Sequence, residues 1–282
     1  MNRIELEVSK LRAQFEGSRY LINTSDGKIL FLRAWEPSTP SKIAVLVFHG
    51  ITAYSGVYDM IGVPLSDAGY NVIGLDLRGH GLSDGKRGDY PNKERLLKDI
   101  SETISFIKEK FPILILLGHS LGNLVALEAL KQQIKDINGV IFMSVGKFIK
   151  PAAYPRMSFG QKLKTLFKII FAYGKPVLKY YREGMVGLND PLFNFQYTPR
   201  FLNILNASRF IKKFKFTETY NFPVLVCIAD GDEIFSVESA HAFYDEILCD
   251  NKEFNVIPNA KHAEYPEGSW TELIAWLNKN FT

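Results

Sequence analysis

Short apolar runs rich in β-branched residues alternate along the chain with segments of helical periodicity. The apolar runs occupy residues 43–48, 72–75, 113–117, 140–143, 224–228 and 253–257. Because these runs do not alternate strictly with polar residues, they are typical of strands covered on both faces. Helical spacing of apolar residues is found in residues 93–108, 121–132, 237–248 and 270–278. This order of elements predicts an α/β fold with a mostly parallel sheet and helices on both faces.

Two further strands are predicted near the N-terminus. Residues 20–23 and 30–35 flank the turn Ser25-Asp26-Gly27, and a turn of this composition between two apolar runs is typical of an antiparallel hairpin. The hairpin brings the predicted number of strands to eight.

The alternation of strands and helices is interrupted once, between residues 144 and 221, where we expect no strand. Within this stretch apolar residues recur at helical spacing with lysines between them, from Phe159 to Phe171. We therefore predict a core of residues 1–145 and 221–282, with a helical cap inserted as residues 146–220. A cap at this point would cover the edge of the sheet where open α/β folds bind ligands.

The predicted cap differs from the core in charge. Residues 147–215 contain 14 Lys and Arg against two acids, a net charge of +12, so the rest of the chain carries −8. Two readings remain open. The apolar face of the cap helix packs on the core or lines the substrate pocket, or the basic and apolar residues together dock on an anionic membrane. No nucleic-acid-binding motif accompanies the charge, and we expect no nucleic-acid partner.

The segment "GHSLG", residues 118–122, lies between a predicted strand and a predicted helix. A strand that turns at once into a helix crowds the neighbouring atoms, so the positions of Gly118 and Gly122 favour residues without a Cβ. The turn would expose Ser120 beside the N–H groups of the helix. The sequence therefore predicts Ser120 as a catalytic nucleophile.

A serine hydroxyl needs a base, and the base needs an acid that orients it; in this architecture the chain order is Ser, acid, His. The chain has five histidines, His49, His80, His119, His241 and His262. Only His262 follows the last predicted strand, so we predict it as the base. We expect the side chain of His119 to point away from Ser120.

The acid is expected after the strand of residues 224–228, where Asp230, Asp232 and Glu233 stand. We favour Asp232, which follows the strand end and a glycine turn, over Asp230. The oxyanion of the reaction needs two N–H donors. We predict the backbone N–H of Leu121, next to the nucleophile, and that of Ile51, in the loop after residues 43–48.

Several motifs together resemble the monoacylglycerol lipase and lysophospholipase-like group of α/β-hydrolases, also described as serine aminopeptidase S33-type hydrolases. The resemblance extends from about residue 20 to the end and rests on the motifs "HGITAYSGVY", "LDLRGHGLSDGKRG", "GHSLGN", "NDPLF", "IADGDEIFS" and "IPNAKHAEYPE". It implies an α/β-hydrolase fold with an eight-stranded sheet and a helical lid, and hydrolysis of glycerol monoesters or lysophospholipids without a metal or cofactor. Two positions depart from the family pattern, since Tyr54 stands in place of a histidine and Asn123 in place of a glycine.

Other functions of the same fold remain open: a short-chain carboxylesterase, a thioesterase or an acyltransferase. Dehalogenase and epoxide hydrolase activity is disfavoured because those enzymes have an aspartate in place of Ser120. A non-catalytic binding protein is disfavoured because no triad member is missing. The N-terminus has no apolar signal-peptide core, no run of about 18 apolar residues occurs, and the chain has two cysteines. We expect a cytoplasmic protein without a membrane span, with peripheral membrane contact as an open alternative.

Overall fold

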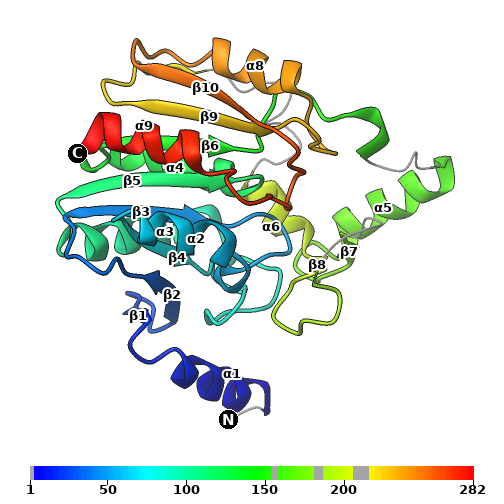
Figure 1. Cartoon of the computed structure of the whole chain (residues 1–282). Helices are drawn as coiled ribbons and strands as arrows, with labels where there is room; N and C mark the ends of the chain where they lie inside the picture. Colours follow the sequence, from blue (N-terminus) through cyan, green and yellow to red (C-terminus); the bar gives the residue numbers. More distant parts are fainter. Residues whose placement is uncertain (1–2, 154–157, 181–186, 206–215) are drawn as a thin grey trace.

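An eight-stranded sheet forms the centre of the computed structural model, which describes residues 3–153, 158–180, 187–205 and 216–282 (Figure 1). The strand order is β1-β2-β4-β3-β5-β6-β9-β10. The pairs β1–β2 and β2–β4 are antiparallel and the other pairs of this sheet are parallel. The strands are β1 (Arg19–Asn23), β2 (Ile29–Trp35), β3 (Ile43–Phe48), β4 (Asn71–Leu75), β5 (Ile113–His119), β6 (Gly139–Met143), β9 (Val224–Ala229) and β10 (Lys252–Ile257). The predicted mostly parallel sheet of eight strands is confirmed.

Helices cover both faces of the sheet, and alternate residues of each strand face opposite layers. In β3, Leu46 packs in the layer that contains α3 (Lys93–Lys108), α4 (Gly122–Gln133) and α8 (Val237–Asp245). Its neighbours Val45 and Val47 pack in the other layer, with α2 (Asp59–Asp67) and α9 (Thr271–Phe281). All six residues of β3 are buried, which explains why the sequence of this strand has no polar alternation.

Helix α3 shows how the local sequence produces one of these elements. Its N-cap Asn92 accepts a hydrogen bond from the backbone N–H of Arg95 at 2.7 Å. Leu96, Ile100 and Ile104 follow at intervals of four residues and are 1% exposed. This spacing places them on one face of the helix, against the sheet.

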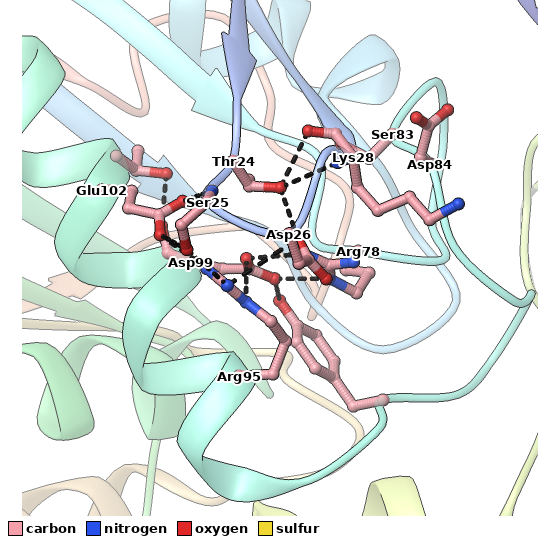
Figure 2. Close-up of polar contacts among 12 residues, drawn as sticks. Thr24, Ser25, Asp26, Lys28, Arg78, Ser83, Asp84, Arg95, Asp99 and Glu102 are labelled. Carbon is pink, nitrogen blue, oxygen red and sulfur yellow. Dashed lines mark hydrogen bonds and ion pairs between the residues drawn. The ribbon is translucent and has the colours of Figure 1, made fainter.

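A group of charges, buried except for the exposed Asp26, joins the β1–β2 turn to α3 (Figure 2). Asp99 is 1% exposed and accepts from Arg78 Nε at 2.7 Å and from the Tyr90 hydroxyl at 2.8 Å. Arg95 Nε lies 2.8 Å from the same carboxylate, and Arg78 also donates to Asp26 at 2.9 Å. Because each of these charges is paired, their burial is tolerated, and the group fixes the loop after β4 to α3.

Two helices of the core were absent from the sequence prediction. Helix α1 (Arg3–Gln14) precedes the hairpin and contacts the loop after β4, where Arg12 Nε donates to the Leu82 carbonyl at 2.6 Å. Helix α2 is nine residues long and contains Pro64. A helix this short and interrupted by proline gives a weak periodic pattern, because few of its turns can be compared.

The segment between β6 and β9 contains most of the elements that belong neither to the eight-stranded sheet nor to the helices that cover it. It includes a 3₁₀ turn η3 (Pro151–Ala153), helices α5 (Phe159–Phe171) and α6 (Pro199–Ile204), and two strands, β7 (Leu178–Lys179) and β8 (Gln196–Tyr197). The expectation of no strand here was wrong: β7 and β8 form a separate antiparallel pair. Two-residue strands produce no readable pattern, since only their pairing across the loop defines them. Parts of the predicted cap, residues 154–157, 181–186 and 206–215, lie outside the described residues. Outside this segment, the described residues include two more 3₁₀ turns, η1 (Ser55–Val57) and η2 (Ile134–Asp136).

Helix α5 projects away from the sheet at the right of Figure 1. None of its residues is buried, and Phe159 and Phe171 are 83% and 70% exposed. The reading in which its apolar face packs on the core is therefore wrong for this structure. Within the described residues, no helix is both long and apolar enough to cross a bilayer.

Candidate active site

Ser120 stands on a strained corner between β5 and α4. Its φ is +53°, in the left-handed region that residues with a Cβ rarely adopt. A Cβ on Gly122 would collide with the carbonyl oxygen of Phe48, and one on Gly118 would lie 2.7 Å from the Asn123 Cα. The structure thus supplies the steric reason for both glycines: the corner passes so close to β3 and to the first turn of α4 that no side chain fits.

His262 and Asp232 lie in line with Ser120. His262 Nε2 is 2.9 Å from Ser120 Oγ, and His262 Nδ1 is 2.8 Å from Asp232 Oδ2. Asp232 is fully buried and His262 is 7% exposed. The other candidate acid, Asp230, is exposed and accepts from the Asn259 N–H at 3.0 Å. Of these two aspartates, Asp232 is the one in contact with His262.

The carboxylate of Asp232 is held in its charged form. Burial raises its pKa, but the hydrogen bond and the charge of His262 and the N–H groups of Phe235 and Ile234 outweigh burial, so the pKa lies below its usual value. Oδ1 accepts both N–H groups, at 2.8 Å from Ile234 and 2.9 Å from Phe235. Oδ2 therefore remains for the Nδ1–H of His262, which sets the tautomer in which Nε2 faces Ser120 as an acceptor.

The two predicted oxyanion donors come from separate segments of the chain. Leu121 stands between Ser120 and the start of α4, and Ile51 lines the pocket in front of Ser120. The preceding Gly50 lies directly against the corner, since a Cβ there would be 3.4 Å from Ser120 Cβ. In the described part of the chain, no group accepts a hydrogen bond from the backbone N–H of Ile51 or Leu121.

A pocket of about 130 Å³ opens in front of Ser120. Tyr180 and Phe193, from the segment between β6 and β9, form part of its wall. The other lining residues come from the core: Gly50, Ile51, Thr52, Ala53, Val57, Tyr58, Met60, His119, Ser120, Glu233, Ile234, His262, Ala263 and Glu264. The wall thus combines loops of the core with the predicted cap.

His119 connects the loop after β3 to the loop that carries His262. The Tyr58 hydroxyl accepts from the Gly50 N–H at 2.8 Å and lies 2.7 Å from His119 Nδ1. His119 Nε2 lies 2.9 Å from the His262 carbonyl oxygen. Because a carbonyl oxygen can only accept, Nε2 carries the proton, and Nδ1 of the neutral ring accepts from the Tyr58 hydroxyl. Burial and the nearby His262 lower the pKa of His119 to about 3, so the ring is neutral.

This link was not predicted from the sequence. His119 was expected only to point away from Ser120, and the structure places both of its ring nitrogens on other partners. The connection depends on Tyr58, which is 61 residues away in the chain, and no local pattern indicates such a contact.

The three remaining histidines lie elsewhere. His49 and His80 are buried with ring centroids 5.0 Å apart. Burial lowers the pKa of His49 to about 4 and that of His80 well below its usual value. His241 is exposed on α8, and its Nδ1 lies 3.0 Å from Oδ2 of Asp245 on the same helix. None of these positions resembles that of a base beside Ser120.

The two departures from the family pattern both have partners. Asn123 is fully buried; its amide donates to the carbonyls of Ser120 and Met143, both at 2.9 Å. It therefore ties the corner to β6. Tyr54 donates its hydroxyl to Asp190 at 2.7 Å, which joins the loop after β3 to the segment after β7.

The sheet order, the serine corner between β5 and α4, and the position of the polar side chains define an α/β-hydrolase. A family model described as serine aminopeptidase, S33, matches residues 39–267. The chain belongs to this family, and the resemblance noted in its motifs is confirmed.

Similar proteins include several monoglyceride lipases. A monoglyceride lipase homolog of monkeypox virus is 26% identical, with 86% of this chain and 89% of the viral protein covered. Rat monoglyceride lipase is 30% identical, but the match covers 44% of this chain and 42% of the rat protein. The solved structure of a soluble variant of yeast monoglyceride lipase, in complex with a substrate analog, has a TM-score of 0.71 at 19% identity, with 93% and 96% covered. This last similarity concerns the fold.

Proposed function

We propose that the chain is a serine hydrolase that cleaves carboxylic esters of lipid-like substrates, of the monoacylglycerol or lysophospholipid type. The observation that carries the proposal is the continuous contact from Asp232 through His262 to Ser120, at 2.8 and 2.9 Å. Membership of a hydrolase family with monoglyceride lipases among its similar proteins supports the ester as substrate. No cofactor or metal enters the proposed reaction.

The proposed reaction has two stages. Ser120 Oγ attacks the ester carbonyl carbon while His262 Nε2 takes the hydroxyl proton, and the carbonyl π electrons move onto oxygen. The C–O bond then breaks, His262 gives the proton to the leaving alcohol, and an acyl-serine remains. Water, deprotonated by the same nitrogen, attacks the acyl carbon; the bond from this carbon to Oγ breaks, His262 returns the proton to Oγ, and the acid leaves. Asp232 stabilises the imidazolium that forms in each stage.

The developing oxyanion is assigned to the N–H groups of Ile51 and Leu121. Their position beside Ser120 and the lack of a described acceptor for either support this assignment. Removing one donor of this kind costs roughly 100- to 1,000-fold in rate.

Hydrolysis of p-nitrophenyl butyrate by a Ser120→Ala variant tests the proposal. We expect kcat to fall about 10⁶-fold, to the residual rate that the oxyanion donors and substrate binding alone support, because no other group takes the place of Oγ. Ser66→Ala is the matched control, since Ser66 is buried and its hydroxyl contacts only the local Val63 carbonyl in the described structure. Undiminished turnover by Ser120→Ala would refute the assignment, provided that both variants keep the far-ultraviolet circular dichroism of the parent chain.

The substrate choice is assigned to the segment of residues 146–220, which we propose acts as a cap. Tyr180 and Phe193 of this segment line the pocket with Ser120, so its residues would contact the acyl or alcohol part of an ester. A chain-length series of monoacylglycerols, lysophospholipids and p-nitrophenyl esters tests the assignment. A preference for medium or long acyl chains on glycerol supports the lipase. A sharp maximum at acetate or butyrate favours the short-chain carboxylesterase, and higher activity on acyl thioesters favours the thioesterase.

We also propose that α5 docks on an anionic membrane surface. Its apolar residues are exposed and alternate with Lys162, Lys164 and Lys168. Each lysine near an anionic surface contributes about 1 kcal/mol, so the three together correspond to about a 100-fold preference for anionic over neutral vesicles. Sedimentation with phosphatidylserine-containing and pure phosphatidylcholine vesicles measures this preference.

A pair of variants separates docking by α5 from general adhesion. Phe167 on α5 is 61% exposed, and Val63 on α2 is an exposed apolar residue of the core, at 44%. Phe167→Ser should weaken vesicle binding, whereas Val63→Ser should leave it unchanged. Equal binding of the parent chain to both kinds of vesicle, or equal effects of the two substitutions, would contradict the proposal.

A further inference from the structure

The loop after β3 contains a strained residue next to Ile51. Thr52 has a φ of +70° and is 3% exposed. A β-branched residue with a positive φ is a backbone outlier that persists only where the surrounding structure holds it. Since Thr52 directly follows Ile51, whatever holds Thr52 also determines where the Ile51 N–H points.

Residues from outside the core hold both backbone polar groups of Thr52. Its N–H donates to the Tyr197 hydroxyl at 2.7 Å, and its carbonyl accepts from the Asn194 N–H at 2.9 Å. On the other side of Ile51, the Gly50 N–H donates to the Tyr58 hydroxyl. The peptide that carries the Ile51 N–H therefore lies between two residues whose N–H groups are each held by a tyrosine oxygen.

Tyr197 is itself rigidly placed. It is 1% exposed, and its ring stacks on Phe201 with centroids 5.1 Å apart and lies 5.8 Å from His80. The next residue, Thr198, donates its N–H to the Gly88 carbonyl at 2.9 Å. Gly88 has a φ of +66°, and a Cβ there would collide with the Gln196 carbonyl oxygen. The backbone around Tyr197 thus lies directly against the loop after β4.

The short β7–β8 pair, which contains Tyr197, also extends to the pocket. Tyr197 in β8 pairs with Leu178 in β7, and Tyr180, the residue after β7, lines the pocket. The Tyr180 N–H donates to the Phe195 carbonyl at 3.0 Å. The β7–β8 pair, together with the residue after β7, therefore contributes both a part of the pocket wall and the hydroxyl that accepts the Thr52 N–H.

We propose that Tyr197 is a positioning residue for the oxyanion site: its hydroxyl holds the Thr52 N–H and thereby keeps the Ile51 N–H directed at the substrate carbonyl. The inference rests on the proposed function, in which Ile51 stabilises the oxyanion. It assigns to the inserted segment a part in the chemical step in addition to its part in forming the pocket.

Tyr197→Phe tests the inference, because phenylalanine keeps the ring and its packing and removes only the oxygen. We expect kcat for p-nitrophenyl butyrate to fall about 10- to 100-fold with KM within about twofold of the parent value, as for an oxyanion donor that is displaced but present. Tyr70→Phe is the matched control. Tyr70 is also 1% exposed and donates its hydroxyl to Asn278 at 2.6 Å, in a contact between the start of β4 and α9. Its kcat should stay within about twofold of the parent value.

The matching thionoester, in which sulfur replaces the carbonyl oxygen, distinguishes positioning from general disruption. Sulfur accepts hydrogen bonds weakly, so a substitution that acts through the oxyanion donors should change kcat for the thionoester by less than about threefold. Equal losses on ester and thionoester, or a Tyr197→Phe kcat on the ester no lower than that of Tyr70→Phe, would overturn the inference while an inactive Ser120→Ala left the proposed function in place. Full activity of Ser120→Ala would overturn both.

Discussion

Replacing Asp232 by asparagine moves the proton of neutral His262 from Nδ1 to Nε2 without changing the shape of the site. Asp232 Oδ1 accepts the N–H groups of Ile234 and Phe235, so an asparagine must keep its carbonyl oxygen there. Its NH₂ group then takes the place of Oδ2 and faces His262 Nδ1. In the parent chain, Oδ2 lies 2.8 Å from this nitrogen. Nδ1 must become the acceptor, and the proton moves to Nε2, the nitrogen that faces Ser120. In this tautomer His262 has no lone pair with which to take the hydroxyl proton.

The expected loss of kcat in Asp232→Asn is about 10⁴-fold, the size seen when a triad histidine is held in the wrong tautomer. At 1.36 kcal/mol for each factor of ten, this corresponds to about 5 kcal/mol of transition-state stabilisation. The measurement is steady-state kcat on p-nitrophenyl butyrate near pH 7.5. Thermal unfolding monitored by circular dichroism accompanies it, to verify that the variant is folded.

Asp230→Asn is the matched control, because Asp230 is the neighbouring acid that the sequence left as an alternative. It is exposed, and its carboxylate contacts the Asn259 N–H rather than His262. We expect its kcat to remain within about twofold of the parent value, as for a surface substitution. The reasoning is refuted if Asp232→Asn keeps more than a tenth of the parent kcat, or if Asp230→Asn loses as much as Asp232→Asn.

Three further predictions concern stability and reactivity. Asp99→Ala leaves the buried cations of Arg78 and Arg95 without a main partner, which should cost about 3–5 kcal/mol and lower the melting temperature by roughly 6–20 °C; a shift below about 2 °C in calorimetry would contradict this. Burial raises the pKa of Asp26, but hydrogen bonds from Arg78 and Thr24 outweigh it and lower the pKa to about 2. Since this folded-state pKa lies below the ordinary 3.8, the stabilisation is present above about pH 4 and lost toward pH 2. Urea unfolding measures the free energy of unfolding at pH 5 and at pH 3. Its decrease between the two should be smaller for Asp26→Asn than for the parent chain, and equal decreases would contradict the lowered pKa of Asp26. Burial raises the pKa of the Cys227 thiol to about 12, so Ellman's reagent should label it only after unfolding, and rapid labelling of the native chain would count against the buried placement.

Most strands and helices of the core followed from local patterns. Residues 43–48 and 93–108 have the bounds expected of them, because burial on both faces and a clear helical period each leave a direct mark on the sequence. Bounds were less accurate where tertiary contacts decide them. Strand β5 continues to His119, two residues past the apolar run, because its ladder with β6 pairs His119 with Met143. Helix α8 ends at Asp245 rather than at residue 248.

The site divides in the same way. Chain order and elimination predicted Ser120 and His262 as a pair, and the structure brings these two side chains into contact. The sequence favoured Asp232 over Asp230 and left Asp230 as the alternative. The structure shows the direction of each side chain: Asp230 faces solvent and Asp232 faces His262.

By itself the sequence determined the corner at residues 118–122, since the requirement for glycine on both sides of Ser120 is a local steric property of a strand that turns into a helix. The tertiary structure alone decided what holds the site together. Tyr58 meets His119 across 61 residues, and Tyr197 meets Thr52 across 145. Such contacts depend on which loops pack against one another, and a hydroxyl looks the same in the sequence whether it faces water or a buried N–H.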